Sequence, residues 1–331
     1  MHELQYLIFT VIILAVIFDF INGFHDTANA IATSVSTRAI KPAHAIIMAA
    51  ILNFLGAMYS TGVAKTIGGD IVSSAELVNE TIIIAALIGA IVWNIATWWL
   101  AVPSSSSHAL VGGIIGAVLV SVGAEGLNSW GIGKIVIALI ASPILAICSG
   151  MLIMYLLYGI FGKLKPSTVN DKFRKVQVLV AATMAFSHGS NDAQKSMGIM
   201  TLALLAGGYI QEFEVPTYVK ILAATAMACG TALGGWRIIK TIGGKIFKLD
   251  PISGFGADLN SSVVIFTATL LHLPVSTTHV VSGSIMGVGT AKRINAVRWG
   301  VAQQMVTAWV LTIPCTAIMG AIAYYVVSSL L

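Results

Sequence analysis

Long apolar stretches are the feature that most limits how this chain can fold. They run over about 4–36, 43–60, 82–102, 108–122, 132–160, 174–208, 216–235, 258–273, 279–290 and 294–330. Several exceed the roughly 20 apolar residues that a helix needs to cross a bilayer. They do not alternate apolar with polar residues, as the strands of a membrane β-barrel do. The chain is therefore expected to be an all-α polytopic membrane protein whose partner is the lipid bilayer.

The scarcity of charge supports this class. Only 9% of the 331 residues are charged, whereas a soluble domain carries about 25%. This excludes an ordinary soluble enzyme, a nucleic-acid-binding protein and a disordered chain. The three cysteines lack CxxC spacing, so the sequence suggests neither a disulfide framework nor a zinc site. Residues 1–24 lack a basic segment and a cleavage site, so we expect a retained first helix.

An internal repeat divides the chain at the polar stretch Lys163–Lys175. FINGFHDTAN at Phe20–Asn29 corresponds to FSHGSNDAQK at Phe186–Lys195, with an offset of 166 residues. VPSSSSHALVGGIIG from 102 corresponds to LPVSTTHVVSGSIMG from 273 (offset 171), and KTIGG recurs at 65 and 240 (offset 175). We predict two repeats, 1–162 and 174–331, joined by a cytoplasmic linker at 163–173.

Loop charges predict the orientation of the repeats. Basic clusters lie at 38–41, 163–175, 237–248 and 292–298, and acidic loops lie at 70–80, 125 and 212–214. Since basic loops favour the cytoplasm, both termini are expected outside and the central loop inside, in the cell membrane. Segments 82–102 and 108–122 form either a re-entrant hairpin or two passes. The first half then makes three full crossings. Because three is an odd number, the second half begins on the opposite side of the membrane and must be inverted.

The first duplicated motif carries carboxylates to membrane depth. About 18 apolar residues precede Asn22, which places Asp26, and by analogy Asp192, near the midplane. There a carboxylate is costly unless it has a partner. Gly23 and Gly189 could let the helices break and expose carbonyls, which predicts a hard-oxygen site for a small cation such as Na⁺. The alternative is that the acids cap or pair with neighbouring helices.

The second duplicated motif is suited to an anion. PSSSSH at Pro103–His108 and PVSTTH at Pro274–His279 each open a helix with hydroxyl residues. Free amides and the helix dipole at such a start attract anions. Two such starts that meet at the midplane could enclose one tetrahedral oxyanion. The hydroxyls could instead only satisfy a re-entrant backbone.

Other polar residues carry less information. For His108 and His279 a structural role is favoured over a ligand role. Gly112-x-x-x-Gly116 and Gly283-x-x-x-Gly287 predict close helix packing. Asp19 has Ala185 as its counterpart and receives no role. Asp258 is expected near the cytoplasmic side, where it gates, attracts cations or caps a helix.

The charges alone suggest that binding of the anion is coupled to binding of cations. Two carboxylates and an oxyanion repel by several kcal/mol even at an effective dielectric of about 20. The anion therefore binds well only with cations, and this linkage is what symport requires. Lys195 adds one permanent positive charge near the second motif.

In these motifs the sequence resembles the inorganic phosphate transporter (PiT) family over essentially its whole length. GFHDTAN and GSNDAQK match the family's duplicated G-x-N-D motif, each paired with a P-x-S-x-T-H-like hairpin. The resemblance implies secondary transport of inorganic phosphate, driven by Na⁺ in many members and by H⁺ in others. It also implies no enzymatic activity, no cofactor besides co-transported sodium, and a possible homodimer with an elevator-like motion.

The resemblance also assigns site residues by position. Phosphate contacts fall on Ser105, Ser106, Ser107, Ser276, Thr277 and Thr278, with Asp26 and Asp192 at the core. Sodium ligands fall on Asn22, Asp26, Asn29, Ser187, Asn191 and Asp192. The first motif departs from the pattern, with His25 where the second has Asn191.

The leading hypothesis is a phosphate:sodium symporter that works by alternating access. A proton-coupled symporter of phosphate, metal-phosphate or sulfate is the alternative, since hydroxyls and amides separate tetrahedral oxyanions poorly. An anion channel would need no buried carboxylates. An intramembrane serine hydrolase would not explain why the Ser/His motif occurs twice.

Overall fold

The computed structural model describes residues 2–233, 239 and 242–330. In the first half the helices are α1 (His2–Ser36), α2 (Pro42–Ala57), α3 (Gly62–Gly69), α4 (Glu80–Trp99), α5 (Ser106–Ser121) and α6 (Ser129–Phe161). In the second half they are α7 (Pro166–Ala206), α8 (Thr217–Leu233), α10 (Pro251–Leu270), α11 (Thr277–Lys292) and α12 (Trp299–Leu330). Short 3₁₀ turns lie at Ala75–Leu77, Ala124–Gly126 and Ile294–Ala296. Over this range the only β-structure is an isolated bridge between Val72 and Leu127, which confirms the all-α class.

Several helices are long and apolar enough to cross a membrane. Among the described residues these are α1 from Gln5 onward, α4, α6 and α12, and α2 with α3 qualifies as one span bent by 71°. The chain is therefore a multi-pass membrane protein. Large apolar side chains such as Ile137, Leu179 and Val310 are exposed on the outside of the bundle, as contact with lipid requires.

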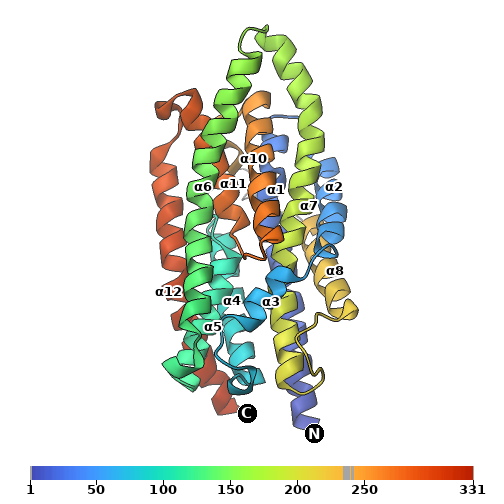
Figure 1. The fold of residues 1–331 in the computed structure, drawn as a ribbon, viewed down its shortest axis with the longest axis vertical. Coiled ribbons are helices and arrows are strands. Elements are labelled where there is room, and N and C mark those ends of the chain that lie inside the picture. Colours follow the sequence, from blue (N-terminus) through green and yellow to red (C-terminus); the bar gives the residue numbers. More distant parts are fainter. Residues whose placement is uncertain (1, 234–238, 240–241, 331) are drawn as a thin grey trace.

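Two helical hairpins enter the bundle from opposite ends. In Figure 1, α4 and α5 occupy the lower half of the molecule and α10 and α11 the upper half, so their tips meet near the middle. Helix α1 begins and α12 ends at the lower end, whereas α6 and α7 join at the upper end. This arrangement has the re-entrant hairpins expected from the sequence and separates both termini from the central connection.

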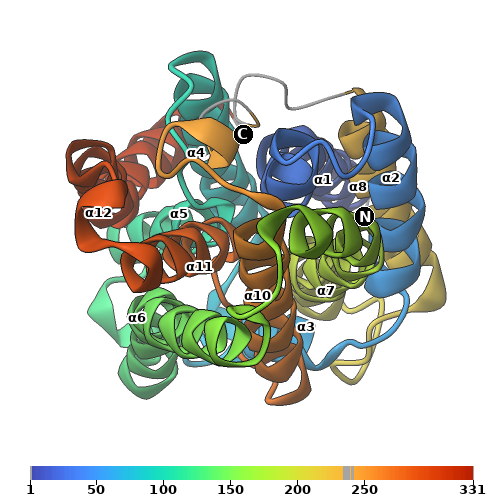
Figure 2. The same ribbon diagram turned by 90° about the horizontal axis from the view of Figure 1, so that it is seen from above.

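Helices of one half pack against helices of the other. Helix α2 packs on α7, α8 on α1, α5 on α12 and α11 on α6, and Figure 2 shows these neighbours side by side from above. Glycines allow the close approach. A Cβ on Gly116 would lie 1.9 Å from the Ala317 carbonyl oxygen, and one on Gly287 would lie 2.3 Å from that of Ile147. The close-packing role predicted for the two GxxxG motifs is confirmed.

The predicted helix breaks at Gly23 and Gly189 are wrong, because α1 and α7 run through these positions without interruption. Both glycines serve helix contact instead. A Cβ on Gly23 would lie 2.3 Å from the Met227 carbonyl oxygen in α8, and one on Gly189 would lie 2.2 Å from that of Asn53 in α2. The sharp bend in an apolar segment of the first half lies elsewhere, between α2 and α3 (71°).

The central connection is mostly helical. Helix α6 ends at Phe161 and α7 begins at Pro166, so most of the predicted linker 163–173 forms the first turns of α7. The two helices project beyond the rest of the bundle as a hairpin (Figure 1). In the repeated KTIGG, residues 240 and 241 lie outside the described residues, as does Arg237 of the basic cluster.

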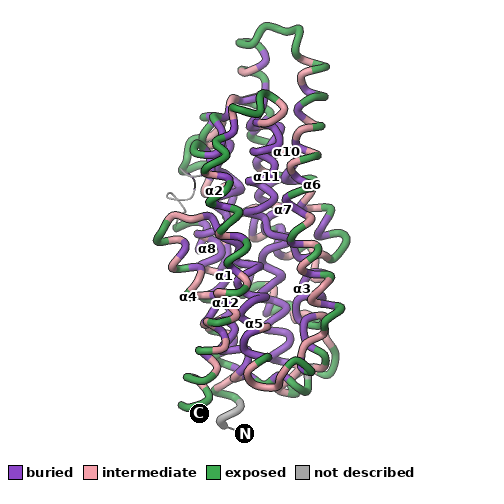
Figure 3. Tube along the Cα trace, turned by 90° about the vertical axis from the view of Figure 1, so that its left-hand side faces the viewer, coloured by how far each residue is buried: buried purple, intermediate pink, exposed green. Residues whose placement is uncertain are grey.

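Two apolar cores lie on either side of a buried polar layer. One core includes Phe18 of α1 and Met197 of α7, and the other includes Ile31 and Met184 of the same two helices. Between these positions both helices carry their duplicated polar motifs, and the chain there is buried (Figure 3). The motifs thus occupy the middle of the bundle.

We expect Gly116→Leu to destabilise the contact between α5 and α12, because the larger side chain overlaps the Ala317 backbone. Overpacking of this kind costs about 1–3 kcal/mol. A lower melting temperature in detergent checks it. Gly133→Leu in α6 is the control, since no atom lies within 4 Å of the added Cβ. Equal melting temperatures of the two variants would contradict the prediction.

Candidate functional site

The tips of the two hairpins form the centre of the site. Ser105 and Ser276 are the N-caps of α5 and α11, and their hydroxyls accept from the amides of His108 at 3.2 Å and His279 at 3.3 Å. The tips also touch each other, because Ser107 Oγ donates to the Val275 carbonyl oxygen at 3.1 Å. The positive ends of two helices therefore converge on one small region.

Histidine rings pack the two tips together. The rings of His108 and His279 lie 4.5 Å apart between centroids, and His279 stacks on Trp309 of α12 at 4.0 Å. His108 Nδ1 lies 2.8 Å from Ser105 Oγ. This packing supports the structural role favoured for these histidines.

Asp26 joins both hairpins to α1. Its Oδ2 accepts from Ser106 at 2.5 Å and its Oδ1 accepts from Thr278 at 3.0 Å. His25 Nδ1 lies 2.8 Å from Oδ1. One hydroxyl comes from each half of the chain, although the two residues are 172 positions apart. The carboxylate is 1% exposed, so the protein donors replace its hydration.

Two asparagines complete the cluster on α1. Asn22 Oδ1 accepts from Ser106 at 3.0 Å, and Asn29 Nδ2 donates to Thr278 Oγ1 at 2.6 Å. Asn22 Nδ2 and Asn29 Oδ1 are buried without a protein hydrogen-bond partner. Buried polar atoms are normally satisfied, so these two atoms point to a bound ligand. A free amide oxygen next to a carboxylate is what a small hard cation prefers.

Asp192 has different partners. Lys195 Nζ donates to its Oδ1 within α7, and Thr277 Oγ1 of the second hairpin donates to Oδ2 at 3.1 Å. His188 Nε2 lies 3.3 Å from Oδ2 without the geometry of a hydrogen bond. Asp192 and Lys195 are both fully buried.

The structure brings Asn191 to the hairpin backbone. Its Nδ2 donates to Thr269 Oγ1 at 3.1 Å and to the Leu273 carbonyl oxygen at 3.2 Å, and its Oδ1 accepts from the Val275 amide at 3.3 Å. The side chain braces the segment that leads to the tip. Ser187 donates to the Thr183 carbonyl oxygen of its own helix at 2.8 Å.

A third carboxylate, which sequence reasoning left without a role, lies in the same layer. Asp19 is fully buried, and its Oδ2 accepts from Ser196, the residue after Lys195. Its Oδ1 has no protein partner. Asp19 lies two turns before Asp26 on α1. This spacing places both carboxylates on one face of the helix, and it was the pattern in the sequence that could have indicated a shared site. Asp19, Asp26, Asp192 and Lys195 thus share the buried layer.

Asp258 forms a separate buried cluster. Its carboxylate accepts from Thr33 and, at 3.0 Å, from Gln177 Nε2. The helix-cap interpretation is wrong, because Asp250 caps α10 by accepting from the Ser253 amide at 3.0 Å. The pKa of Asp250 lies below its usual value. Burial of the carboxyl group acts to raise this pKa, but the hydrogen bonds from Lys292 and Ser253 lower it by more.

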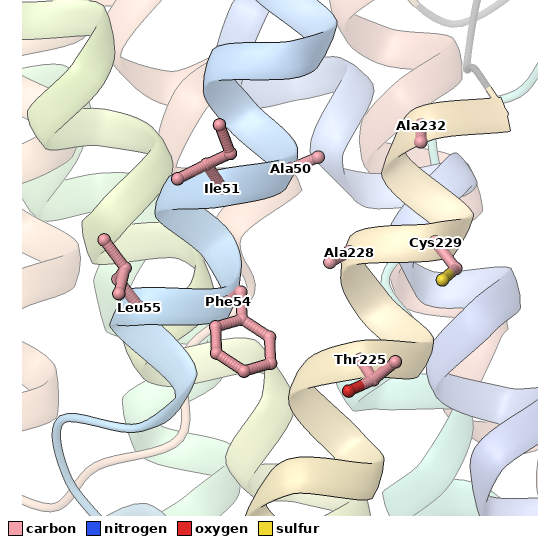
Figure 4. A pocket seen from close by; sticks show the side chains of 8 residues that line it. All are labelled: Ala50, Ile51, Phe54, Leu55, Thr225, Ala228, Cys229 and Ala232. Atoms are coloured by element: carbon pink, nitrogen blue, oxygen red, sulfur yellow. The ribbon is translucent and has the colours of Figure 1, made fainter.

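A surface groove between α2 and α8 is unrelated to the polar layer. It has a volume of about 370 Å³ and is lined by apolar side chains such as Phe54 and Leu55, together with Thr225 and Cys229 (Figure 4). Its lining side chains carry no charge that could hold an anion.

The fold and the site together define a class of protein. An all-α membrane protein with opposed re-entrant hairpins and ionisable residues in its middle has the features of a secondary transporter.

Comparisons with known proteins identify the family. Residues 22–167 and 162–320 match the phosphate transporter family, and the chain belongs to that family. It is 51% identical over 330 residues to the "Probable low-affinity inorganic phosphate transporter" of Bacillus subtilis strain 168, covering 99% of each chain. It is 44% identical over 316 residues to the protein of the same name from Rhizobium meliloti strain 1021, covering 95% of this chain and 94% of that one.

A solved structure, that of "The sodium-dependent phosphate transporter", has the same fold. It superimposes with a TM-score of 0.90 at 26% sequence identity, covering 98% of this chain and 100% of that chain. The protein is therefore a phosphate transporter and not an enzyme.

We expect Asn191→Ala to loosen the second hairpin tip, because it removes three hydrogen bonds to that segment. Each is worth about 1 kcal/mol. Faster amide hydrogen exchange at residues 271–276, measured by mass spectrometry, checks this. Asn128→Ala at the N-cap of α6 is the control. Unchanged exchange in that segment would show that Asn191 does not brace it.

Proposed function

We propose that this protein is a sodium-coupled symporter of inorganic phosphate that works by alternating access. One observation carries the proposal: hydroxyls from both hairpin tips converge on the buried carboxylate Asp26, beside amide atoms that lack protein partners. The name of the structural relative, which includes sodium dependence, supports the choice of ion.

Phosphate is proposed to bind between the tips. The hydroxyls of Ser106, Ser107, Thr277 and Thr278 are the donors, together with the amides at the starts of α5 and α11. Ser105 and Ser276 hold those helix starts in place through their capping bonds. In the structure these hydroxyls donate to Asp26, Asp192 and the Val275 carbonyl oxygen. Bound phosphate would accept hydrogen bonds from these hydroxyls, so that the carboxylates would be free to bind cations.

Sodium is proposed to bind at Asp26 and Asn29. Asn22 can contribute only through its Oδ1, which accepts from Ser106, because its partnerless atom is the donor Nδ2. The carboxylate supplies charge, and the partnerless Oδ1 of Asn29 supplies a second oxygen. The corresponding set, Ser187, Asn191 and Asp192, is a weaker candidate. Asn191 is used by the hairpin, Ser187 donates within its own helix, and Asp192 already has an ammonium partner.

Coupling follows from charge in the buried layer. Phosphate carries at least one negative charge into a site that holds Asp19, Asp26 and Asp192 against Lys195. Like charges a few ångströms apart repel by several kcal/mol at an effective dielectric of about 20. A cation bound at Asp26 removes much of this cost, so sodium and phosphate each raise the affinity for the other.

The architecture supports the rest of the proposal. Residues 1–162 and 174–331 would be inverted repeats, because equivalent helices of the two halves make equivalent contacts. The termini would lie outside the cell membrane and the connection between α6 and α7 in the cytoplasm, since that connection carries the basic cluster. A homodimer remains a prediction that the mass of the protein in detergent would test.

Proton coupling is the second candidate. The ring of His25, which stands where the second motif has Asn191, lies 2.8 Å from Asp26 Oδ1 at Nδ1. In proteoliposomes we expect phosphate uptake to follow a Na⁺ gradient. Uptake driven by a pH gradient alone would replace the sodium proposal with this one.

We expect Asp26→Asn to abolish coupled uptake while the protein stays folded, because the amide keeps the shape but loses the charge that holds a cation. Radiolabelled phosphate uptake and the melting temperature in detergent check both parts. Wild-type uptake by the variant would remove Asp26 from the site.

We expect Ser106→Ala to weaken phosphate binding about tenfold or more, since it removes a buried donor to a charged ligand. Its effect on the sodium dependence should be smaller. Ser149→Ala is the matched control, because Ser149 is half-buried in α6 and donates to the Leu145 carbonyl oxygen of its own helix. Equal phosphate affinities in the two variants would contradict the assignment.

A further inference from the structure

Helix α7 buries a lysine in the polar layer. Within the described part of the chain, Lys195 is the one lysine or arginine whose side chain is buried, with an exposed fraction of 0%. Its Nζ donates to Asp192 Oδ1, three residues earlier on the same helix. A buried ammonium is destabilising unless a carboxylate neutralises it, so this pair forms one electrostatic unit.

The internal repeat shows what stands in the same place in the first half. The offset of 166 residues aligns Asp192 with Asp26 and Lys195 with Asn29. Asn29 is uncharged, donates to Thr278 and keeps a buried Oδ1 without a protein partner. The two equivalent carboxylates therefore differ in their direct donors: Asp192 accepts a hydrogen bond from an ammonium, whereas Asp26 accepts from hydroxyls.

The other contacts of Asp26 and Asp192 are consistent with an ammonium donor at Asp192 alone. Asp26 accepts from Ser106 and Thr278 and lies beside His25, and none of these carries a permanent positive charge. Around Asp192, Thr277 donates to Oδ2 and Lys195 to Oδ1. A sodium ion at Asp192 would have to displace or lie beside an ammonium, and two positive charges at that separation repel.

We propose that the ammonium of Lys195 permanently takes the place of a coupling cation in the second half, so that only the Asp26 site binds a monovalent cation from solution. This inference rests on the proposed cation-coupled symport. It assigns one external cation site per protein, where the duplicated motif alone would assign two. The lysine also gives the second hairpin a fixed positive charge near Thr277, which favours phosphate in every transport cycle.

Lys195→Asn tests the inference, because it installs the side chain that the first half uses at the equivalent position. Purified full-length protein is reconstituted in proteoliposomes, and the initial rate of phosphate uptake is measured against external Na⁺. We expect the Hill coefficient for Na⁺ to rise from about one in the wild type to about two in the variant. Lys134→Asn is the matched control, since it breaks an exposed ion pair with Asp70 (3.0 Å) far from the polar layer, and it should keep the wild-type value.

A direct measurement of Na⁺ binding tests the inference even if the variant does not transport phosphate. Equilibrium binding of radioactive Na⁺ to the protein in detergent, with phosphate present, should give one more bound ion per chain in Lys195→Asn than in the wild type. An equal number in both proteins would overturn the inference. A Hill coefficient that stays the same while phosphate affinity falls would also overturn it, because Lys195 would then be a phosphate ligand.

The proposed function and this inference can fail separately. Wild-type uptake that ignores a Na⁺ gradient would refute sodium coupling. The difference in bound Na⁺ between Lys195→Asn and the wild type would still decide whether the ammonium fills a cation site.

Discussion

The convergence of two helical hairpins on one buried carboxylate is the interaction on which the rest of the structure depends. Asp26 accepts hydroxyl hydrogen bonds from Ser106 of the first hairpin and from Thr278 of the second. Because a carboxylate in the middle of a membrane is costly without partners, this contact holds both tips at α1. The close packing of each hairpin on the last helix of the other half, through glycines on α5 and α11, then fixes where the tips can lie.

Asymmetry within the duplicated framework underlies the proposal that the site binds ions of both signs. The two halves supply equivalent helix starts with free amides and hydroxyls, which suit an anion. Their carboxylates have different neighbours: Lys195 lies beside Asp192, whereas the uncharged Asn29 stands at the equivalent position near Asp26. The proposed anion site would thus be shared by both halves, whereas the proposed cation site belongs to α1 and the hairpin tips that touch it.

Much of the fold was predictable from the sequence, because each of these predictions rested on a local pattern. Apolar length predicted the membrane class, and the spacing of Gly112 and Gly116 predicted close packing. The break expected at Gly23 was wrong, since a glycine that permits unwinding also permits another backbone to approach, and only the position of α8 distinguishes the two. The bracing role of Asn191 was missed for a similar reason, because its partners Thr269 and Val275 lie about 80 residues away.

The sequence by itself determined the membrane class, the duplicated motifs and the presence of buried carboxylates and hydroxyls, because these follow from composition and from short-range spacing. Only the tertiary structure decided which hydroxyl meets which carboxylate, since Thr278 reaches Asp26 from the opposite half of the chain. It also decided that Lys195 lies buried on Asp192 rather than extended toward water. The pairing of Thr278 with Asp26 depends on helix packing across the two halves, and no local pattern encodes that geometry. Lys195 and Asp192 lie three residues apart on one helix, so their spacing is local, and tertiary packing decides only that both are buried.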